Sequence, residues 1–318
     1  MKYKNEWGFL NEESKKQIQN WINKLLGIEI MSISASMVKE LRERTGAGMM
    51  ECKKALVDSN GDLDAAIDLL RTTGQAKAEK KAKRIAAEGR IVIKSDTKHA
   101  VILEINSETD FVANDSNFIN FAESVAEAIL NNEINDLESL NKTNLSSGTN
   151  IEMARTDLIA KIGENISIRR FNKIRKCDNM GLYTHGAKIG VIVSLSGGDE
   201  EVSKDIAMHV SAFNPLCLSE DDIDKDVLER EKAIFANQAK ESGKPQEIMD
   251  KMVEGKVKKF LSEVSLLSQD FVKDSDITVR EYLNQNGAIA LDFVRLKVGE
   301  GIEVETKDFA EEVAEQLK

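Results

Sequence analysis

The stretch RIVIKSDTKHAVILEIN, Arg90–Asn106, decides the fold of this chain. It holds two runs of β-branched and aliphatic residues around a short polar turn, which is typical of two strands joined by a turn. A loop follows, and then a segment with apolar residues at helical spacing, namely Phe118, Phe121, Ala122, Val125 and Ile129. Together these features predict a small sheet covered by a helix.

The same order of elements recurs twice. ISIRRFNKIRK (Ile166–Lys176) and KIGVIVSL (Lys188–Leu195) resemble strands, and the loop SGGD follows them. The next helix carries apolar residues on one face, namely Val202, Ile206, Val210 and Phe213. A third, shorter copy pairs AIALDFVRLKV (Ala288–Val298) with a helix over Asp308–Leu317. These units predict an α+β core of antiparallel sheets, and their spacing is too irregular for a solenoid.

The composition is that of a globular protein with an acidic surface. The chain has 318 residues, of which 41% are hydrophobic and 31% charged, so it is long enough for two or three domains. Its 44 Lys and Arg against 55 Asp and Glu give a formal net charge of −11, which disfavours binding to nucleic acid and anionic membranes. No apolar run is long enough to cross a bilayer.

Neither the cysteines nor the histidines form a metal-binding pattern. The three cysteines, Cys52, Cys177 and Cys217, are far apart and odd in number. This usage favours a reducing compartment in which each thiol is buried as a small apolar group. The three histidines are equally scattered, so we expect no metal cofactor.

Residues 1–33 predict an extension that differs from the rest of the chain. Its apolar residues fit one short amphipathic helix that ends at Gly27, and they are Trp7, Phe9, Ile18, Trp21, Ile22, Leu25 and Leu26. The segment lacks the arginines of a mitochondrial presequence and the continuous apolar stretch of a secretory signal. Met31 offers an alternative start of translation.

Residues 34–73 predict a bundle of three short helices. Gly46 and Gly48 separate the first helix from the second, and the turn SNGD separates the second from the third. Asp62, the last residue of that turn, is suited to cap the third helix. Residues 74–89 are rich in Lys and Ala and predict a basic, solvated helical linker.

The rest of the chain predicts a core with an inserted helical hairpin. We expect one core subdomain over residues 90–175, a second over residues 176–220 and 268–300, and a C-terminal helix module over residues 301–318. Residues 221–267 carry two narrow apolar seams with charged flanks, which predicts a protruding antiparallel hairpin. The seam residues are Ile223, Val227 and Ile234 on the first helix and Met249, Val253, Val257, Phe260 and Val264 on the second.

The sequence contains no catalytic motif. TGAGMM, Thr45–Met50, opens a helix but lacks the Lys-Ser/Thr ending of a phosphate-binding loop and the glycine spacing of a dinucleotide site. No serine nucleophile elbow is present, and no pair of carboxylates stands in an apolar frame that would separate their pKa values. We therefore expect that the protein is not an enzyme.

The segment SETDFVAND, Ser107–Asp115, places an aromatic residue beside a carboxylate directly after an apolar strand. One interpretation continues the following helix backwards, so that Phe111 lies on its apolar face, seven residues before Phe118. The other starts the helix after Phe111, where Asn and Asp are typical helix-start residues, and leaves the aromatic ring exposed. Asp110 is then a helix cap or a solvated carboxylate.

Five stretches resemble the bacterial elongation factor Ts family. They are VKELRERTGAGMMECKKAL (Val38–Leu56), ETDFVA (Glu108–Ala113), HGAKIGV (His185–Val191), IAMHVSAFNP (Ile206–Pro215) and SGKPQEIMDKMVEGKVKKFLSEVSL (Ser242–Leu266). The similarity runs from about Ser34 to the C-terminus. The first stretch and the Thr-Asp-Phe element, in this order and separation, are highly specific.

The resemblance implies a cytoplasmic guanine-nucleotide exchange factor for elongation factor Tu, the GTPase that delivers aminoacyl-tRNA to the ribosome. It implies a ubiquitin-associated-like bundle, a duplicated core, a protruding coiled coil and a C-terminal module. Such a protein needs no cofactor of its own and acts on the Mg-GDP bound by its partner. It implies no direct contact with nucleic acid or membrane, and a higher-order complex with the partner is one option.

The resemblance also implies which residues touch the partner. The Thr-Asp-Phe element, here Thr109, Asp110 and Phe111, intrudes between two partner helices near the magnesium site. His209 contacts the phosphate-loop region of the partner. From periodicity alone, His209 falls seven residues after Val202 and so belongs to the apolar face of its own helix.

Two strand residues and the helical bundle complete the implied interface. The family places Ile189 and Gly190 at the partner surface, whereas a glycine in a strand by itself marks a close backbone approach. The bundle residues that dock on the nucleotide-binding domain of the partner are Arg42, Met49, Met50 and Lys53. A helix that begins at the two methionines cannot easily bury both together with Cys52, so at least one faces outwards.

One contact is affected by a departure from the family pattern. The sequence here is SQDFVKD, where the family often has Pro-Phe-Val. Asp270 and Lys273 are the departures, and they bear on the implied contact of Val272 with the partner.

Two other functions fit parts of the sequence. A ubiquitin-associated-type adaptor or scaffold would use the bundle and would leave the core and the Thr-Asp-Phe element without a role. An enzyme that uses buried carboxylates would turn over a small molecule by itself.

Overall fold

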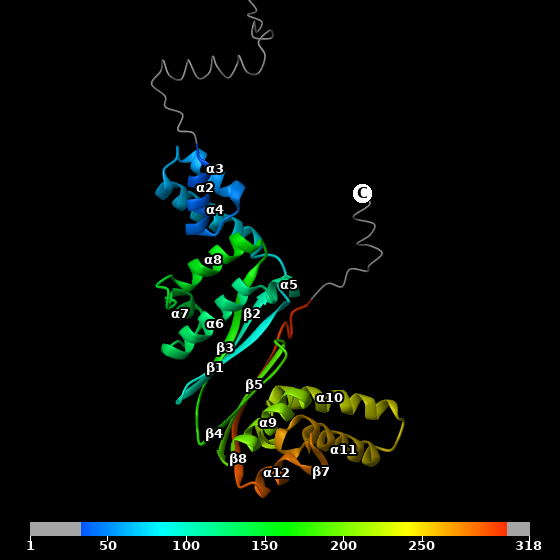
Figure 1. The fold of residues 1–318 in the computed structure, drawn as a ribbon. Coiled ribbons are helices and arrows are strands. Elements are labelled where there is room, and N and C mark those ends of the chain that lie inside the picture. The colour runs from blue at the N-terminus through cyan, green and yellow to red at the C-terminus, as the bar shows by residue number, and fades with distance from the viewer. Residues whose placement is uncertain (1–32, 304–318) are drawn as a thin grey trace, which may run out of the picture. The chain divides into compact units, whose positions relative to one another are not determined.

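The structure is a computed structural model, and it describes residues 33–303 (Figure 1). The contacts divide the chain between Glu79 and Lys80 into two units, each with its own set of packed elements. The helix expected to end at Gly27 and the helix expected at Asp308–Leu317 lie outside the described residues. Within the described range, no helix is both long and apolar enough to cross a membrane.

In the described part of the first unit, three helices begin, and they are α2 (Ala35–Thr45), α3 (Met49–Asp58) and α4 (Leu63–Lys81). Gly46 has a φ of 68° and ends α2. Asp62 caps α4, because its Oδ1 accepts hydrogen bonds from the backbone N–H groups at the start of that helix. The apolar faces meet in a small core of Val38, Leu41, Cys52, Ala55, Leu56 and Ala66.

The third helix is longer than the sequence predicted. It was expected to end near Thr73 and to be followed by a separate helical linker over residues 74–89. Instead, α4 continues without a break to Lys81, and the chain is extended from Glu88 onwards. The Ala, Lys and Glu residues after Gly74 are strong helix formers, and they offset the cost of one glycine inside the helix.

The first sheet is antiparallel with the strand order β1-β2-β3. β1 (Glu88–Ser95) and β2 (His99–Ser107) are the two strands predicted from the opening stretch, and they form a hairpin. β3 (Ile166–Arg175) pairs with β2. The repeat pattern grouped this third strand with the following strand of the sequence, and that grouping was wrong, because β3 completes the first sheet.

Helices cover one face of the first sheet (Figure 1). The elements between β2 and β3 are α5 (Asp110–Ala113), α6 (Ser116–Asn131), α7 (Leu137–Lys142) and α8 (Ile151–Ile162). α6 packs against β1 and β2 with the apolar face that the sequence predicted, and α8 contacts β3. The hydrophobic core around the first sheet therefore lies between that sheet and these helices.

The second sheet is antiparallel with the strand order β4-β5-β8. β5 (Ile189–Gly197) and β8 (Ala288–Lys297) were predicted, whereas β4 (Asn179–His185) was not. β4 has no run of β-branched residues and carries Gly181, whose added Cβ would lie 1.9 Å from the carbonyl oxygen of Ser203. The elements between β5 and β8 are α9 (Glu200–Phe213), η1 (Glu220–Asp222), α10 (Lys225–Glu241), α11 (Gln246–Val264), η2 (Leu266–Ser268), β6 (Asp270–Phe271), β7 (Asp274–Thr278) and α12 (Val279–Gln285).

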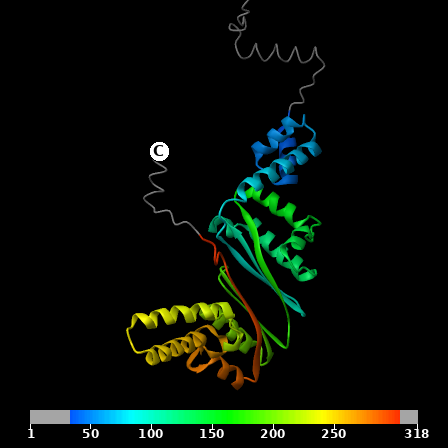
Figure 2. The ribbon, with the colours of Figure 1, turned by 180° about the vertical axis from the view of Figure 1, so that it is seen from behind.

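The two sheets have the same topology. In each, a hairpin is followed by helices and then by a third strand that pairs with the second strand of the hairpin. The register of that pairing shifts between Glu104 and Ile105 in β2, and between Ser194 and Leu195 in β5. α9 covers β4 and β5 as α6 covers β1 and β2 (Figure 2).

The remaining faces of the two sheets pack against each other. The buried apolar residues between them are Ile91, Ala100, Ile102, Ile174, Ile192 and Leu296. Gly190 on β5 lies in this interface, because a Cβ added to it would be 2.4 Å from Cγ2 of Ile91. The two sheets and their helices therefore form one continuous body within the second unit.

α10 and α11 lie side by side as the expected hairpin (Figures 1 and 2). Of the seam residues predicted for the first helix, Ile223 is buried but precedes α10, and on α10 itself the seam is shifted by one residue. Val227 and Ile234 are 37% and 38% exposed, whereas their neighbours Leu228 and Phe235 are half-buried. The ring of Phe235 meets that of Phe260 edge-on, with centroids 6.3 Å apart. Adjacent apolar residues leave the phase of a helix open, and only packing against the partner helix selects it.

Candidate functional site

Phe111 is 85% exposed, more than any other large apolar side chain of residues 33–303. It lies in α5, a single helical turn. α6 begins separately, because the carboxylate of Asp115 accepts hydrogen bonds from the N–H groups of Asn117 and Phe118. The interpretation with an exposed aromatic ring is therefore confirmed, although Phe111 lies in a short helix and not in a loop.

Buried neighbours fix the direction of α5. Val112 and Ala113, the two residues after Phe111, are only 9% and 3% exposed. Nη1 of Arg90, on β1, donates to the carbonyl oxygen of Ala113 over 2.9 Å. Because one side of the turn packs on the sheet, the side chain of Phe111 is held in solvent.

Thr109 and Asp110 complete the Thr-Asp-Phe element. Thr109 is the N-cap of α5, and its half-buried Oγ1 accepts a hydrogen bond from the N–H of Val112 over 3.4 Å. Asp110 is the first residue of the helix and is exposed. The sequence left open whether Asp110 caps a helix or is solvated, and the structure shows that Thr109 is the cap.

His209, on α9, lies inside the core below the second sheet and is 0% exposed. Its Nδ1 accepts a hydrogen bond from the N–H of Val272 over 3.2 Å, so the proton is on Nε2, which donates to Oε1 of Gln269 over 3.0 Å. Burial lowers the pKa of His209, although the contact with Gln269 opposes this shift, and the ring is neutral near pH 7. The implied contact of the imidazole with a partner therefore does not fit its burial. The ring stacks instead on Phe213, with centroids 4.7 Å apart.

The turn that carries Val272 is held by an ion pair. Val272 is half-buried, and Nζ of Lys273 lies 2.6 Å from Oδ1 of Asp205 on α9. The hydroxyl of Tyr282 donates to the other carboxylate oxygen over 3.1 Å. Burial and this hydrogen bond raise the pKa of Tyr282 to about 12. The departure at Lys273 thus has a structural role, because it ties the β6–β7 turn to α9, whereas Asp270 is exposed.

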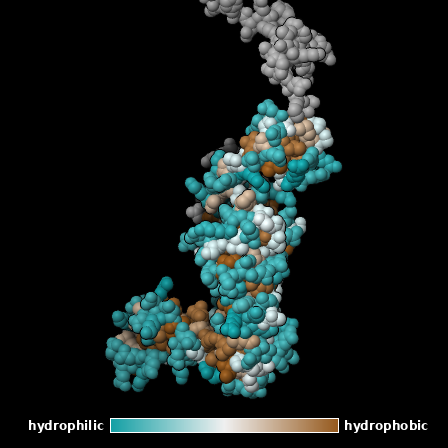
Figure 3. Space-filling model, turned by 90° about the vertical axis from the view of Figure 1, so that its left-hand side faces the viewer, coloured by the Kyte–Doolittle hydropathy of each residue, from teal (hydrophilic) through white to brown (hydrophobic). Residues whose placement is uncertain are grey.

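An apolar surface lies between the helical hairpin and the elements around the second sheet (Figure 3). Phe213 and Leu216, which follow His209 in the sequence, are 48% and 56% exposed. The N–H of Leu216 donates to the carbonyl oxygen of Val264 at the end of α11 over 2.8 Å. His209 is in direct contact with Val272 and stacks on the half-exposed ring of Phe213.

Ile189 and Gly190 begin β5 and differ in their surroundings. Ile189 is half-buried and packs against the core of the second sheet. Gly190 is buried between the sheets, and an added Cβ would also be 3.1 Å from Cδ1 of Ile102. Gly190 therefore marks a close backbone approach, and it does not lie at the protein surface where the resemblance placed it.

The helical bundle exposes both methionines at the start of α3. Met49 is 60% and Met50 74% exposed, whereas Cys52 is fully buried. The expectation that at least one methionine faces outwards is confirmed. Arg42 and Lys53 are exposed on the same bundle. This surface combines flexible apolar side chains with positive charge.

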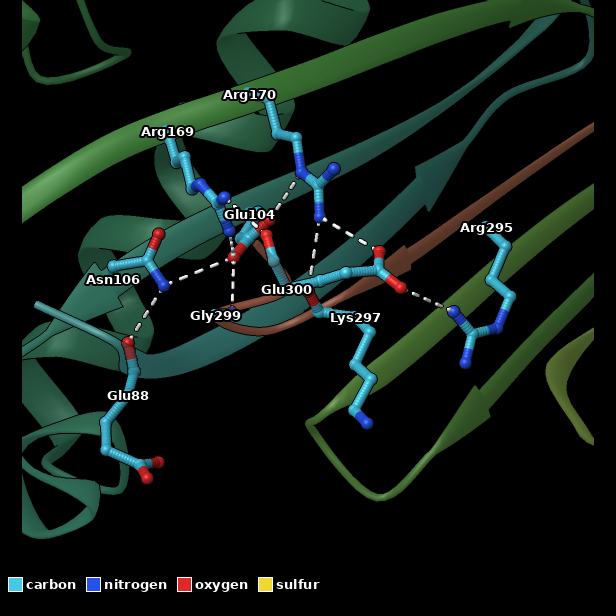
Figure 4. Close-up of polar contacts among 9 residues, drawn as sticks. All are labelled: Glu88, Glu104, Asn106, Arg169, Arg170, Arg295, Lys297, Gly299 and Glu300. Carbon is cyan, nitrogen blue, oxygen red and sulfur yellow. Dashed lines mark hydrogen bonds and ion pairs between the residues drawn. The ribbon is translucent and has the colours of Figure 1, made fainter. Parts of the chain in front are cut away.

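A buried carboxylate that the sequence analysis missed joins the ends of the two sheets (Figure 4). Glu104, on β2, is 0% exposed. Its Oε1 accepts hydrogen bonds from Nη1 of Arg169 over 2.9 Å and from the N–H of Gly299 over 2.8 Å. Its Oε2 accepts from Nε of Arg170 over 2.6 Å, and Arg170 also donates to the carbonyl oxygen of Lys297 over 3.2 Å. A single charged residue inside the apolar run VILEI was the available signal.

Glu104 remains ionised in the folded protein. Burial by itself raises the pKa of this carboxyl, but the hydrogen bonds from the N–H of Gly299 and from the two arginines outweigh burial and lower it. The charge is therefore compensated on both oxygens. The network holds the end of β8 on β2 and β3 and so fixes the two sheets against each other.

The cysteines differ from the prediction in one case. Cys52 and Cys217 are buried, as expected, but Cys177 is exposed between β3 and β4. The expectation of burial was wrong for Cys177, because the connection between the two sheets runs over the surface. In the described part of the chain, no cluster of His, Cys, Asp and Glu has the arrangement of a metal site.

The fold and the exposed apolar residues define a protein-binding module. An α+β body holds Phe111 in water on a turn fixed at its base, and the helical bundle exposes two methionines. Exposed aromatic and methionine side chains of this kind are typical of surfaces that bind another protein. The class of protein is thus one that acts through a macromolecular partner.

Comparison with known proteins identifies the family. The family model Elongation factor TS matches residues 108–300. The chain is 55% identical over 290 residues to elongation factor Ts of Legionella pneumophila (strain Paris). This alignment covers 90% of this chain and 99% of the relative. It is 53% identical over 292 residues to elongation factor Ts of Thioalkalivibrio sulfidiphilus (strain HL-EbGR7), covering 91% of this chain and 99% of the relative. The chain belongs to the elongation factor Ts family. It is accordingly a nucleotide exchange factor for elongation factor Tu in translation elongation, and not an enzyme.

Proposed function

We propose that the chain accelerates GDP release by placing Thr109, Asp110 and Phe111 against the magnesium and phosphate site of elongation factor Tu. The observation that carries this proposal is the 85% exposure of Phe111 on a turn whose next two residues are buried. An apolar ring held in water does not stabilise its own fold. Its burial in a gap of the partner would contribute about 1.5–3 kcal/mol to the complex.

Thermodynamic linkage explains how such a contact promotes exchange. A GTPase holds its nucleotide through phosphate-cradling amides and a magnesium ion. A factor that binds the nucleotide-free form more tightly must weaken nucleotide binding by the same ratio. The Thr-Asp-Phe element needs only to disturb the magnesium site, and no catalytic residue of the exchange factor is required. Fresh nucleotide can then enter and displace the factor.

The helical bundle supplies a second proposed contact. Met49 and Met50 are exposed, and Arg42 and Lys53 are exposed charges on the same bundle. Methionine side chains adapt to irregular apolar surfaces, and the two cations suit an acidic rim. We assign this surface to the nucleotide-binding domain of the partner.

The second sheet supplies further proposed interface residues. Val272 and Ile189 are half-buried and remain candidates for direct contact. Gly190 and His209 are buried, so their proposed part is to support that surface from within. For His209 this support is given to the stacked ring of Phe213, which is half-exposed.

The finer domain organisation is also a proposal. The matching topology and register shifts of the two sheets support a duplicated core, with one subdomain over residues 90–175 and the other over residues 176–220 and 268–300. Residues 34–73 form the ubiquitin-associated-like bundle, and residues 221–267 form the protruding coiled coil. The extension over residues 1–33 and the C-terminal module over residues 301–318 complete the assignment.

The proposed setting is the cytoplasm. The partner is elongation factor Tu, and the substrate of the exchange is the Mg-GDP that the partner holds, so the chain itself needs no cofactor. The net charge of −11 disfavours direct binding to nucleic acid or to membranes. A higher-order complex of the two proteins is part of the proposal.

Release of a fluorescent GDP from purified elongation factor Tu tests the proposed function. In a stopped-flow measurement, the full chain should accelerate release in a concentration-dependent manner that saturates. The same chain, unfolded by heat, is the control for non-specific effects. If the folded chain leaves the rate of release unchanged, the proposed function is wrong.

A further inference from the structure

The residues that lead into α5 lie next to the residues that lead into β3. In the pairing of β2 with β3, Ser107 is opposite Ile166, so residues 108–109 leave the sheet beside residues 164–165. α8 ends just before this point at Gly163, whose φ of 94° turns the chain back towards the sheet. Two segments that are far apart in the sequence thus meet at the base of the Thr-Asp-Phe element.

Glu164 binds both hydrogen-bond donors of Thr109. Its Oε2 accepts from the backbone N–H of Thr109 over 3.0 Å, and its Oε1 accepts from the hydroxyl over 2.8 Å. The hydroxyl oxygen remains the acceptor for the N–H of Val112, and the carbonyl oxygen of Thr109 accepts from the hydroxyl of buried Ser107 over 2.8 Å. The residue directly before α5 is therefore fixed through its backbone and its side chain.

A second carboxylate braces the same junction in the opposite direction. Oε1 of Glu108 accepts a hydrogen bond from the N–H of Asn165 over 2.6 Å. Nδ2 of Asn165, which is only 6% exposed, donates to the carbonyl oxygen of Arg84 over 2.8 Å. Each segment thus supplies a glutamate that binds a backbone N–H of the other. Such charge-assisted hydrogen bonds are stronger than those between neutral groups.

The length of α5 makes these anchors necessary. The helix has four residues, and a single turn is not stable by itself in water. Its end is held by Arg90 at the carbonyl oxygen of Ala113, and its start is held by Glu164 at Thr109. Loss of either anchor would let the turn change its direction without unfolding the sheet below it.

We propose that Glu164 is a positioning residue for nucleotide exchange, which fixes Thr109 and thereby the direction in which α5 presents Phe111. This inference rests on the proposed function of Phe111 and extends it to a residue that acts only through Thr109. Glu164 lies on the segment between α8 and β3, 53 positions further along the chain than Phe111.

The test uses the full chain with Glu164→Ala and Glu164→Gln in the release assay with elongation factor Tu. For Glu164→Ala, the maximal rate of GDP release should fall roughly tenfold, as expected for the loss of a charge-assisted hydrogen bond. The concentration that gives half of the maximal effect should change less, because the other contacts with the partner remain. Glu164→Gln retains one acceptor oxygen and should give a maximal rate between that of the wild type and that of Glu164→Ala.

Glu123→Ala is the matched control. Glu123 is a half-buried carboxylate on α6, which covers the same sheet. It pairs with Lys94 on β1, and the acceptor of Thr109 is Glu164 instead. Its removal should leave the maximal rate at the wild-type value. Thermal melting of all variants should show that the folded state is retained.

A double variant separates positioning from a merely structural effect. Phe111→Ala with Glu164→Ala should release GDP at the rate of Phe111→Ala alone, because Glu164 acts through the ring that is already missing. A wild-type rate for Glu164→Ala, or losses that add in the double variant, would overturn the positioning role and leave that of Phe111 intact. If the wild-type chain itself fails to accelerate release, the proposed function fails instead.

Discussion

Phe111 and Phe118 are seven residues apart on what the sequence allowed to be one helix, yet one is 85% exposed and the other is fully buried. The cap at Asp115 causes this difference, because it ends one turn and starts the next helix in a new direction. Thr109 caps the first turn in the same way. Two side-chain caps within seven residues therefore decide which aromatic ring belongs to the core and which to the surface.

Phe111→Ala should slow GDP release without affecting the fold. The ring buries apolar area only in the complex, so its loss should reduce the stimulated rate by roughly tenfold or more. The free energy of unfolding should stay within about 0.5 kcal/mol of wild type, because the ring is exposed. Ile289→Ala, at a position that is 64% exposed on β8, is the control for a loss of exposed apolar surface. An unchanged rate for Phe111→Ala would falsify the role of the ring.

Gly190→Ala should destabilise the protein by about 1–3 kcal/mol. The new methyl group would lie 2.4 Å from Cγ2 of Ile91, a β-branched side chain with little freedom to move. Urea unfolding measures the change. Gly255→Ala is the control, because a Cβ at Gly255 on α11 meets nothing within 4 Å and improves helix propensity. Equal stability of Gly190→Ala and wild type would mean that the sheets are less closely packed than the structure shows.

At the scale of elements, a buried polar contact accompanies the packing of two apolar sheets in the second unit. Most of the interface is formed by Ile, Leu and Ala side chains, which are not directional. Glu104 adds direction, because it binds Arg169 and Arg170 on β3 and the N–H of Gly299 beyond the end of β8. Removal of such a buried acceptor takes one partner from each of two guanidinium groups, and breaking a buried pair in this way costs more than the pair itself contributes.

Glu104→Gln should lower the free energy of unfolding at pH 7 by about 3 kcal/mol. The folded-state pKa of Glu104 lies below its ordinary value of 4.5, so the stabilisation is present above that value and is lost as the pH falls through the folded-state pKa. The difference between wild type and Glu104→Gln should therefore shrink below about pH 4.5. Urea unfolding at pH 7 and at acidic pH measures both effects.

The control for this variant is Glu123→Gln, which removes a half-exposed ion pair with Lys94. Such a pair contributes about 1 kcal/mol or less, so the change at pH 7 should be small. If Glu104→Gln were as stable as Glu123→Gln at pH 7, the network would not hold the sheets together.

At the scale of the whole molecule, the chain combines two units that each expose large apolar residues. The first unit presents Met49 and Met50, and the second presents Phe111. Two separate contacts with one partner raise the affinity through a high effective concentration of the second contact once the first has formed. Under the proposed function, exchange requires that the contact of Phe111 is aimed correctly, which is the role inferred for Glu164.

Removal of residues 1–30 should leave nucleotide exchange within about twofold of the full chain, a change of less than about 0.5 kcal/mol. The resemblance to the family begins at about Ser34, and the proposed contact residues all lie beyond it. The release assay with the truncated chain measures this, with the full chain as the reference. A large loss of stimulation would mean that the extension takes part in exchange.

Much of the fold could be predicted from local patterns. Local residue types predicted the first hairpin, the helices α6 and α9, and the breaks in the bundle. Their effects act over a few positions, as with the cap at Asp62 and the glycine at Gly46. β4 was missed because its local pattern is weak and its pairing with β5 supplies the missing stability. The seam on α10 was placed one residue early, because adjacent apolar residues do not define a single face.

The candidate site was predictable to a similar extent. The Thr-Asp-Phe element was found because it resembles a known family, and the helix-start residues Asn114 and Asp115 favoured its exposure. Glu104 gave a weak signal, as a charge within an apolar strand. Glu164 gave none, because its partner Thr109 is 55 positions away and nothing in either segment indicates the pairing.

The sequence by itself determined the class of fold and the family, and it left two alternatives for Phe111, since periodicity, caps and motifs are local properties of the chain. Only the tertiary structure decided that β3 pairs with β2, that the ring of Phe111 is exposed, and that Glu164 anchors Thr109. The physical reason is that strand pairing and buried hydrogen bonds join residues across long stretches of sequence, and their partners are selected by packing rather than by the neighbouring residues.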